Sequence, residues 1–471
     1  METVLFILLL ASFAANFTML ILYYLHMFQL HSYKPKEQLR WLKTNFVSAV
    51  IGKNFGTLLT IPLLLFGGMI GQGISVPVLI FSSFFCRPKK AKKPLVYTNR
   101  IKRLLTTLFI LLAVSISFTI FFRNAWTTGI LLPLMQLLAA LLVLLANIMN
   151  HPIEKSINRF YINDAKHLIE EMPCLKVIGI TGSYGKTSVK FFLNKLLSAQ
   201  YNVLMTPESF NTTLGVVRTI RSSLKATHDI FICEMGAKNI GDIKEICDIV
   251  HPSYGIITSI GPQHLESFLT IENVTRTKFE LADALPENGI AFLNNDNEYI
   301  RKRPVQKSVI RYGIEQLDSD YLATKIEVSD KGSSFHIRVD DQDYRFETRL
   351  IGSHNVANIV GAIAAAHTLG VSMTDLIRQV KSLESVPHRL QLIRGNHALI
   401  IDDAYNSNPS GAKAALDTLA TFDGVKILVT PGMVELGTKQ DECNRIFGTQ
   451  AAAVCNHVVL VGEKQTKSIY E

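Results

Sequence analysis

The first 150 residues have almost no acidic side chains. Glu2 and Glu37 are their only carboxylates, against 14 lysines and arginines, so this part has a net charge of +12. Residues 151–471 contain 34 basic and 37 acidic residues, a net charge of −3. A basic excess confined to an apolar segment is typical of a protein at a membrane surface, and it argues against a nucleic-acid partner.

Paired cysteines are absent as well. The six cysteines contain no C-x-x-C pair and have no regular spacing. This excludes a zinc or disulfide framework and predicts reduced, mostly buried thiols. Internal repeats and low-complexity tracts are also missing, and 471 residues leave room for about three ordinary domains.

Long uncharged apolar runs occur in the first part of the chain, where a helix of ~20 residues is enough to cross a bilayer. The runs are 4–30, 56–86, 104–122 and 128–149. The first is not a signal peptide, because it lacks a basic leading segment and is too long. Residues 1–150 are therefore predicted to form a multi-pass transmembrane region of three to four hydrophobic segments.

The run 56–86 is interrupted by four glycines, at positions 67, 68, 71 and 73. It is either one tilted span or a re-entrant hairpin broken at the glycines, since it is too short for two full spans. The loops 31–53 and 87–103 are both basic, and basic loops stay in the cytoplasm. Both can do so only if the run is re-entrant, which favours the hairpin.

Charge also predicts how the membrane region is oriented. Eight basic residues lie in 87–103, whereas only Arg123 lies between the last two runs. The segment after residue 149 is thus expected to be cytoplasmic, and the protein to be a multi-pass protein of the cell membrane with its remaining domains in the cytoplasm. Around Trp41, a short amphipathic helix along the membrane interface is an alternative for part of the first loop.

The remainder of the chain has the pattern of α/β domains. After a polar, helix-compatible linker at 151–173, short apolar strands alternate with helical segments, which predicts a parallel sheet covered by helices. The strands are expected at 176–180, 230–234, 255–260 and 290–294. The period changes to two over 321–350, which predicts appended antiparallel strands, and helices follow at 354–369 and 373–381.

A second α/β unit is predicted from about residue 386. Its strands are expected at 398–402, 426–430 and 458–461. Three strands make a thin sheet for a self-standing domain, so we expect this domain to be truncated at residue 471. The predicted division is a membrane region 1–150, a linker 151–173, a central domain 174–385 and a C-terminal domain 386–471.

Residues 179–190 read Gly-Ile-Thr-Gly-Ser-Tyr-Gly-Lys-Thr-Ser-Val-Lys and directly follow the expected first strand. Gly182 and Gly185 allow the backbone to turn N–H groups toward an anion, at the positive N-terminal end of the next helix. Lys186 can reach the outer phosphates of a nucleotide, and the Thr187 hydroxyl can ligate Mg²⁺. The pattern therefore predicts a nucleotide phosphate loop.

Two further polar residues follow strands of the same predicted sheet. Glu234 ends the strand 230–234, and His264 follows the strand 255–260. Ligands of open α/β sheets bind at the carboxyl ends of the strands, where the phosphate loop also lies. Alone, each residue is more often a cap or a structural side chain, but beside the loop the pair favours a divalent cation bridging phosphates.

The loop spacing, which has Ile180 where a standard Walker loop has glycine, resembles that of the Mur ligase family, and within it most closely the MurF type. The resemblance covers about residues 174–471 and rests on motifs in the family's order: Thr181 to Thr187, Glu234-Met235-Gly236-Ala237, His264-Leu265-Glu266, Gly352-Ser353-His354-Asn355, His388-Arg389-Leu390, Asp402 to Pro409 and Met433-Val434-Glu435-Leu436-Gly437. The run Asp402 to Pro409 and the run Glu435-Leu436-Gly437 favour the MurF type over its relatives.

The resemblance implies a P-loop-type central ATPase domain, a C-terminal dinucleotide-fold-like α/β domain, and ATP and Mg²⁺ as cofactors. It implies that ATP is bound by Thr181, Gly182, Ser183, Tyr184, Gly185, Lys186, Thr187, Asn295, His354, Asn355, Arg389 and Asp403. It also implies that the metal ions are held by Thr187, Glu234, His264 and a carbamylated Lys278. The catalytic residues that it implies are Lys186, Lys278, His264 and Asn408, of which Asn408 faces the incoming amine.

The implied reaction is amide bond formation of cell-envelope or peptidoglycan synthesis through an acyl phosphate. Enzymes of the MurF type begin with a domain that binds a UDP-linked muramoyl peptide, and here membrane segments take its place. The family's Gly-Asp-Met is also Pro431-Gly432-Met433 in this chain. The expected acceptor is therefore a carboxylate-bearing muramoyl peptide or a lipid-linked counterpart, and the donor is an amino acid or dipeptide. A polyglutamate-type synthetase and a non-catalytic, nucleotide-binding membrane scaffold are the alternatives.

Overall fold

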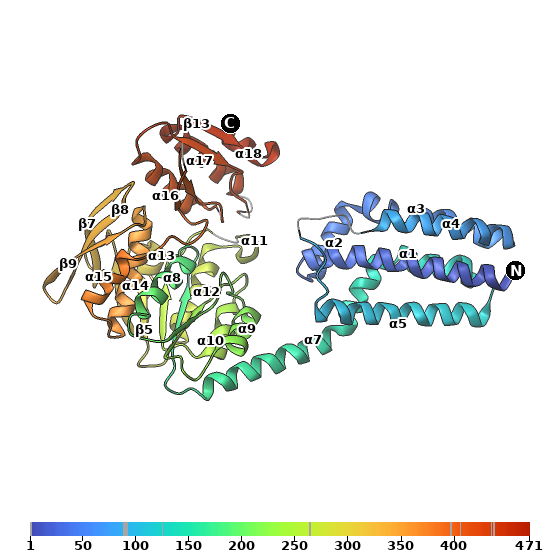
Figure 1. The fold of residues 1–471 in the computed structure, drawn as a ribbon, viewed down its shortest axis with the longest axis horizontal. Coiled ribbons are helices and arrows are strands. Elements are labelled where there is room, and N and C mark those ends of the chain that lie inside the picture. The colour runs from blue at the N-terminus through green and yellow to red at the C-terminus, as the bar shows by residue number, and fades with distance from the viewer. Residues whose placement is uncertain are drawn as a thin grey trace. The chain divides into compact units, whose positions relative to one another are not determined.

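The computed structural model describes residues 2–87, 93–124, 126–262, 265–395, 398–405, 407–434, 436 and 439–471. The chain divides into two compact units, Met1–Arg159 and Phe160–Glu471, which are described separately below. The first unit is helical, and the second combines sheets with helices (Figure 1).

The first unit consists of helices, most of which are apolar, whereas the helix Pro35–Thr44 is amphipathic. They are α1 (Glu2–Leu30), α2 (Pro35–Thr44), a π-helix at Val47–Ile51, α3 (Phe55–Phe66), α4 (Gly68–Cys86), α5 (Asn99–Phe122), a second π-helix at Thr127–Leu131, α6 (Leu132–Leu137) and the first part of α7 (Ala139–Glu170). By length and composition, α1, α4 and α5 are long and apolar enough to cross a membrane. The helix predicted around Trp41 is present as α2.

The glycine-rich run 56–86 forms two helices that fold back on each other. The helical conformation is interrupted between α3 and α4, where Gly68 has a φ of 52°. Gly56 near the start of α3 lies against Ser82 near the end of α4, so the two helices run antiparallel. One continuous span over 56–86 is therefore excluded, and the run has the form of a helical hairpin.

The run 128–149, predicted as one span, is broken. The segment Thr127–Leu137 and helix α7 are bent by 71° with respect to each other. The break falls at Leu138, whose backbone leaves the helical conformation. Because the residues on both sides of the break are equally apolar, hydropathy gives no sign of it. Helix α7 continues to Glu170, as expected for a helical linker.

Hydrogen bonds and an ion pair connect several polar side chains of the first unit. Arg103 forms a two-pronged ion pair with Glu154, at 2.7 and 2.8 Å. Thr57 donates to Gln136 Oε1 at 2.7 Å between α3 and α6. Such pairing is required in an apolar bundle, because an unpaired polar group there has no water to bond.

The second unit is built on a nine-stranded sheet with the order β2-β3-β1-β4-β5-β6-β7-β8-β9. Its strands are β1 (Lys176–Thr181), β2 (Val203–Met205), β3 (Ile230–Glu234), β4 (Tyr254–Ile257), β5 (Ile290–Asn294), β6 (Ser308–Gly313), β7 (Tyr321–Ser329), β8 (Gly332–Val339) and β9 (Gln342–Thr348). Strands β1 to β6 pair in parallel, whereas β7, β8 and β9 pair antiparallel to one another. The predicted change from a parallel to an antiparallel sheet is confirmed.

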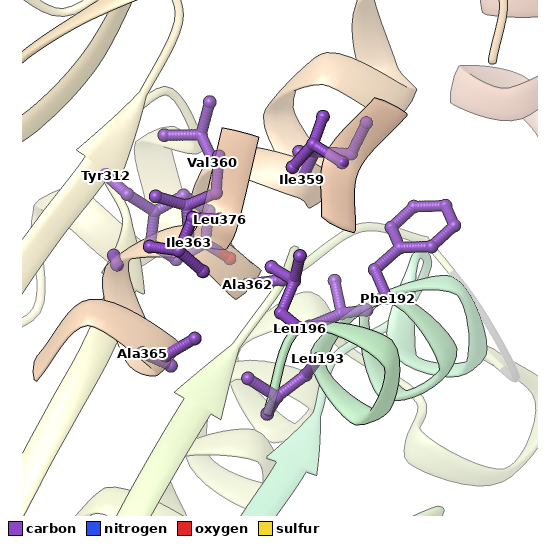
Figure 2. Close-up of a cluster of buried hydrophobic side chains, with 14 of the residues drawn as sticks. Phe192, Leu193, Leu196, Tyr312, Ile359, Val360, Ala362, Ile363, Ala365 and Leu376 are labelled. Carbon is purple, nitrogen blue, oxygen red and sulfur yellow. The ribbon is translucent and has the colours of Figure 1, made fainter. Parts of the chain in front are cut away.

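Helices cover both faces of this sheet, as its buried apolar strands require. They are α8 (Lys186–Leu197), α9 (Thr213–Ser223), α10 (Asp242–Val250), α11 (Leu265–Phe268), α12 (Ile271–Asp283), α13 (Glu298–Arg301), α14 (Ser353–Thr368) and α15 (Met373–Lys381). Figure 2 shows Phe192, Leu193 and Leu196 of α8 facing Ala362 and other apolar side chains of α14. This contact fixes the helix that follows the predicted phosphate loop.

The last part of the chain carries two small sheets. Strands β10 (Gln391–Arg394) and β11 (Leu399–Asp402) are antiparallel, and β12 (Ile427–Thr430) and β13 (His457–Leu460) are parallel. Helices α16 (Pro409–Ala420), α17 (Gln440–Val454) and α18 (Glu463–Tyr470) accompany them. Within the described residues β11 pairs with β10 instead of β12, so the three predicted strands do not form one sheet. The short strand β10 was not predicted.

Candidate functional site

The segment between β1 and α8 turns at two glycines. Gly182 and Gly185 have φ angles of 152° and 81°, which favour glycine. A Cβ atom at Gly182 would overlap the Thr258 hydroxyl, and one at Gly185 would lie 2.6 Å from Asn358 Oδ1. Both glycines are therefore required by conformation and by space, as the predicted phosphate loop demands.

The loop is anchored on one side and open on the other. The N–H groups of Ser183 and Tyr184 donate to the backbone oxygen and the hydroxyl of Ser259, at 2.7 and 2.9 Å. Thr181 donates from its hydroxyl to the Met235 carbonyl at 2.9 Å. Helix α8 has no side-chain cap at Gly185 among the described residues, which leaves N–H groups of its first turn for an anion.

Lys186 lies over this loop. Its ammonium donates to the carbonyls of Gly182 and Ser183, at 2.7 and 3.1 Å. Burial lowers the pKa of Lys186 to about 8, although the nearby carboxylate of Glu234 opposes the shift. A bound phosphate would supply the anionic partner that the two carbonyls only partly replace.

Three parts of the chain meet at Thr187. The Thr187 hydroxyl donates to Glu234 Oε1 at 3.2 Å, so the predicted pair of magnesium ligands is brought together. A guanidinium nitrogen of Arg389, from the C-terminal domain, lies 3.3 Å from the same hydroxyl. Glu234 is only 1% exposed. The site thus combines the loop, the end of β3 and one residue that follows α15 by several positions.

Arg389 is held in a strained segment. His388 and Leu390 on either side of it have φ angles of 60° and 45°, which are uncommon for residues other than glycine. The guanidinium lies 4.3 Å from the centre of the Tyr405 ring. Asp403 accepts a hydrogen bond from the Leu390 N–H at 3.1 Å. Burial raises the pKa of Asp403 to about 6, against the opposing effects of that bond and of Arg389.

Lys278 lies on α12 and is 3% exposed. Burial lowers its pKa to about 7, and the positive charge of Lys186 adds to this shift. No hydrogen bond of its ammonium group to the described residues is present. A neutral amine is the form that reacts with CO₂, so the environment of Lys278 suits the predicted carbamate.

His264 lies outside the described residues, so its predicted role stays a prediction. Within the described residues, no group of three or more His, Cys, Asp and Glu side chains is arranged to hold a metal ion. Thr187 and Glu234 are the members of the predicted metal set that lie in contact.

The residues predicted near the adenine differ in their availability. His354 Nδ1 is buried and has no hydrogen-bond partner among the described residues, and burial lowers the pKa of His354 to about 4. In contrast, the Asn355 amide donates to the Ile351 carbonyl at 2.9 Å. The Asn295 amide donates to Asp318 at 2.8 Å and accepts from Arg311 at 3.1 Å. Of these three residues, only His354 has a buried side-chain nitrogen without a hydrogen-bond partner in the described part of the chain.

Asn408 acts as a helix cap in this structure. Its Oδ1 accepts a hydrogen bond from the Gly411 N–H at 2.8 Å, at the start of α16. Capping is an ordinary role for asparagine at this position. The bond leaves the Nδ2 group of Asn408 for other partners, and its predicted contact with the amine stays a prediction.

Comparison with known proteins identifies the fold of the second unit. The profile of the Mur ligase middle domain matches residues 180–366, and that of the Mur ligase glutamate ligase domain matches residues 388–471. The UDP-N-acetylmuramoyl-tripeptide–D-alanyl-D-alanine ligase of Escherichia coli is 30% identical over 336 residues, which are 69% of this chain and 74% of that protein. The chain belongs to the Mur ligase family.

Other members of the Mur ligase family support the same assignment. The corresponding ligase of Bacillus subtilis is 31% identical over 60% of this chain, which spans 62% of that protein. The crystal structure of MurF from Acinetobacter baumannii covers 67% of this chain and 69% of its own at 29% identity, with a TM-score of 0.63. MurF from Thermotoga maritima in complex with ADP covers 66% and 72% at 27% identity, with a TM-score of 0.62. Neither family profile extends into residues 1–179.

Mur ligases are ATP-dependent, ADP-forming ligases that use Mg²⁺. The residues of this chain fit both ATP and Mg²⁺. The glycine loop can adopt its conformation only because Gly182 and Gly185 lack side chains, and the first turn of α8 is uncapped and can bind an anion. Thr187 and Glu234 supply adjacent oxygen atoms of the kind that Mg²⁺ prefers. The His354 Nδ1 atom is a further buried polar atom of the same domain that is free to bond a ligand.

Three residues of the site were not predicted from the sequence. Lys190 lies 3.1 Å from Glu234 Oε2, and Asn211 donates to Glu234 Oε1 at 3.0 Å. Asn358 lies against Gly185. Lys190 and Asn358 follow recognised motifs by three or four residues, one helical turn, and this spacing is the signal that could have indicated them. Asn211 lies in a loop, and no spacing points to it.

Proposed function

We propose that this protein is a membrane-anchored, MurF-like ligase that forms an amide bond in peptidoglycan synthesis at the expense of ATP. The observation that carries the proposal is the convergence of Thr187, Glu234 and Arg389 on one side of the glycine loop. The relatives named above support the substrate class, because their names describe ligases that join D-alanyl-D-alanine to a UDP-linked muramoyl tripeptide.

In the proposed reaction, a carboxylate of the acceptor attacks the γ-phosphate of ATP, and ADP leaves. An amine then attacks the carbonyl carbon of the acyl phosphate, so that the amide forms and inorganic phosphate is released. Lys186 neutralises the charge that develops on the transferred phosphoryl group, and Arg389 closes the site from the C-terminal domain. Mg²⁺ held by Thr187 and Glu234, with His264 and carbamylated Lys278 at a second ion, would supply further neutralisation of the phosphates.

The remaining assignments complete the proposal. Asp403 contacts the ribose, His354, Asn355 and Asn295 surround the adenine, and Asn408 faces the amine. The division into a membrane region 1–150, a linker 151–173, a central domain 174–385 and a C-terminal domain 386–471 belongs to the same proposal. Its support is the match of the two family profiles to 180–366 and 388–471.

We further propose that the first unit anchors the protein in the cell membrane with the ligase domains in the cytoplasm. Three helices of spanning length and a bent pair support this, as does the concentration of basic residues at 31–53 and 87–103. The helical hairpin at 56–86 is compatible with a re-entrant segment that leaves both basic loops on the same side. An enzyme held at the membrane can act on a lipid-linked muramoyl peptide, and we propose this acceptor beside the UDP-linked one.

The alternatives are less well supported. A polyglutamate-type synthetase is disfavoured because relatives at about 30% identity carry MurF-type names. A scaffold without catalysis is disfavoured because Lys186 lies over the glycine loop, Glu234 contacts Thr187, and Lys278 is buried within range of the Lys186 charge. No feature of the described residues favours either alternative.

The replacement Lys186→Ala tests the proposed function. We expect ADP production in the presence of acceptor and amine to fall at least ~100-fold, because the main cation over the phosphate loop is lost. The measurement is ADP release by purified protein with UDP-linked and lipid-linked muramoyl peptides. Lys195→Ala on the exposed side of the same helix is the control and should leave the rate unchanged. Equal ADP release by Lys186→Ala and the parent would refute the proposal.

A further inference from the structure

Lys190 is a buried lysine whose charge has one anionic partner in the described structure. Its side chain is 0% exposed, and its ammonium lies 3.1 Å from Glu234 Oε2. A lysine is almost never buried unless it is paired. Thr187 lies one helical turn before Lys190 and is also buried, so Lys190 shares its face of α8 with the candidate metal ligand.

The two oxygens of Glu234 are held by different groups. Oε1 accepts from the Thr187 hydroxyl and from the Asn211 amide, at 3.2 and 3.0 Å. Oε2 faces Lys190. Burial raises the pKa of Glu234, but Lys190 and Lys186 outweigh this effect and hold the pKa below its usual value. Oε1 is the oxygen on the Thr187 side, beside the glycine loop.

Lys190 also ties this carboxylate to the loop between β2 and α9. Its ammonium donates to the carbonyl of Glu208, a residue with a φ of 42°. Two more bonds from the same loop reach the end of β3: the Thr206 hydroxyl accepts from the Glu234 N–H at 3.1 Å, and the Asn211 carbonyl accepts from the Gly236 N–H at 2.7 Å. A single buried ammonium therefore connects the helix after the phosphate loop, the end of β3 and this loop.

We infer that Lys190 is a positioning residue that fixes Glu234 for Mg²⁺ by holding the oxygen that does not face Thr187. The inference rests on the proposed nucleotide site. In metal sites, groups that hydrogen-bond the ligands orient them, and their loss typically weakens metal binding or activity 10–100-fold. The pair of Lys190 and Glu234 provides such a support from within the domain, before nucleotide is bound.

The test is metal affinity of the full-length protein, measured with Mn²⁺ by electron paramagnetic resonance in the presence of a non-hydrolysable ATP analogue. By charge alone, removing a cation beside the carboxylate would strengthen cation binding. We expect the opposite sign for Lys190→Met, an approximately 10–100-fold loss of Mn²⁺ affinity. Lys190→Arg should recover part of the loss, and Lys195→Met on the exposed side of α8 should change nothing.

A double variant distinguishes a positioning role of Lys190 from a loss of the fold. Lys190→Met combined with Glu234→Gln removes both charges, and if Lys190 acts through Glu234 the double variant binds Mn²⁺ no more weakly than Glu234→Gln alone. Unchanged or tighter Mn²⁺ binding by Lys190→Met would overturn the inference. If Glu234→Gln itself leaves Mn²⁺ affinity unchanged, the proposed metal site is wrong instead. Thermal unfolding of each variant shows whether a loss of binding reflects a loss of fold.

Discussion

At the scale of single residues, the candidate site concentrates cations around one carboxylate. Lys186, Lys190 and Arg389 all lie close to Glu234 or to the Thr187 hydroxyl that bonds it. Such a site attracts a polyphosphate, because the cations outnumber the carboxylate in a region with little water. Burial lowers the pKa values of Lys186 and Lys278, and the charge of Arg389 adds to the shift at Lys186 while that of Lys186 adds to the shift at Lys278. An anionic ligand relieves this repulsion.

Lys278 should make the enzyme dependent on CO₂. Its neutral amine can form a carbamate, which replaces a cation by an anionic oxygen ligand. We expect Lys278→Ala to lose activity and added short-chain carboxylates to restore part of it, because they can occupy the space of the carbamate. ADP release measures the activity, and intact-protein mass measures the carbamate. The assigned role is wrong if no carboxylate restores activity and no carbamate is detected.

Asp403 should give nucleotide binding a pH dependence. Its pKa is raised to about 6 in the folded protein, so the carboxyl gains a proton as the pH falls through 6. If ionised Asp403 accepts ribose hydroxyls, ATP affinity falls below this pH by roughly 10–100-fold, the range for a hydrogen bond to a charged group. For stability the sign is opposite, because a raised carboxyl pKa favours the folded state as the pH falls from 6 toward 4.

The measurement for Asp403 is the dissociation constant of an ATP analogue between pH 5 and 8. The matched variant is Asp403→Asn, which keeps the shape of the side chain but does not titrate. It should bind more weakly at pH 8 and lack the inflection near pH 6. An inflection of the same size in Asp403→Asn would show that another group is responsible.

At the scale of elements, the site depends on helices that pack away from it. Helix α8 carries Lys186, Thr187 and Lys190 at its first turns, and its opposite face is packed against α14 (Figure 2). Helix α14 also brings Asn358 against the glycine loop. The apolar contact between the two helices therefore sets the position of the residues proposed to bind phosphate.

Shortening one side chain in this contact should destabilise the second unit. Ile363 is 0% exposed, and Ile363→Ala removes buried carbon atoms and leaves a cavity. We expect a loss of about 2–5 kcal/mol in the free energy of unfolding. Urea unfolding followed by tryptophan-independent probes, such as far-UV circular dichroism, measures it. Ile240→Ala, at a residue that is 46% exposed, is the control and should change stability by less than about 1 kcal/mol. A similar effect of both variants would contradict the packing argument.

At the scale of the whole molecule, two units of different chemistry share one chain. The first is an apolar helical unit with a net charge of +12 over residues 1–150, and the second contains both domains matched by the Mur ligase profiles. The residues proposed to bind ATP and Mg²⁺ all lie beyond residue 175. Binding of nucleotide and access to the acceptor are therefore expected to be separable.

Removal of residues 1–150 should give a soluble protein that still binds ATP. It should lose most activity toward a lipid-linked acceptor, because anchoring confines both partners to one surface and raises their effective concentration. The measurement is turnover of full-length and truncated protein on UDP-linked and lipid-linked muramoyl peptides. Equal, efficient use of the UDP-linked substrate by both forms would show that the membrane region only locates the enzyme.

The sequence alone determined the features that depend on neighbours along the chain. The glycine loop, the strands that end at Thr181 and Glu234, and the apolar helices α1 and α5 follow from local spacing and hydropathy, which act over a few residues. The motifs from Thr181 to Pro409 indicated the family, because each motif is a short run of neighbouring residues and their order can be read along the chain.

Only the tertiary structure decided which of these residues meet and what holds them. The role inferred for Lys190 could be recognised only in the structure, because the parallel pairing of β1 and β3 brings the end of β3 beside α8. Lys190 and Glu234, which then lie in contact, are 44 positions apart in the sequence. Arg389 reaches Thr187 across about 200 positions. The break in 128–149 was likewise decided by packing, because apolar composition is the same in a straight helix and a bent one.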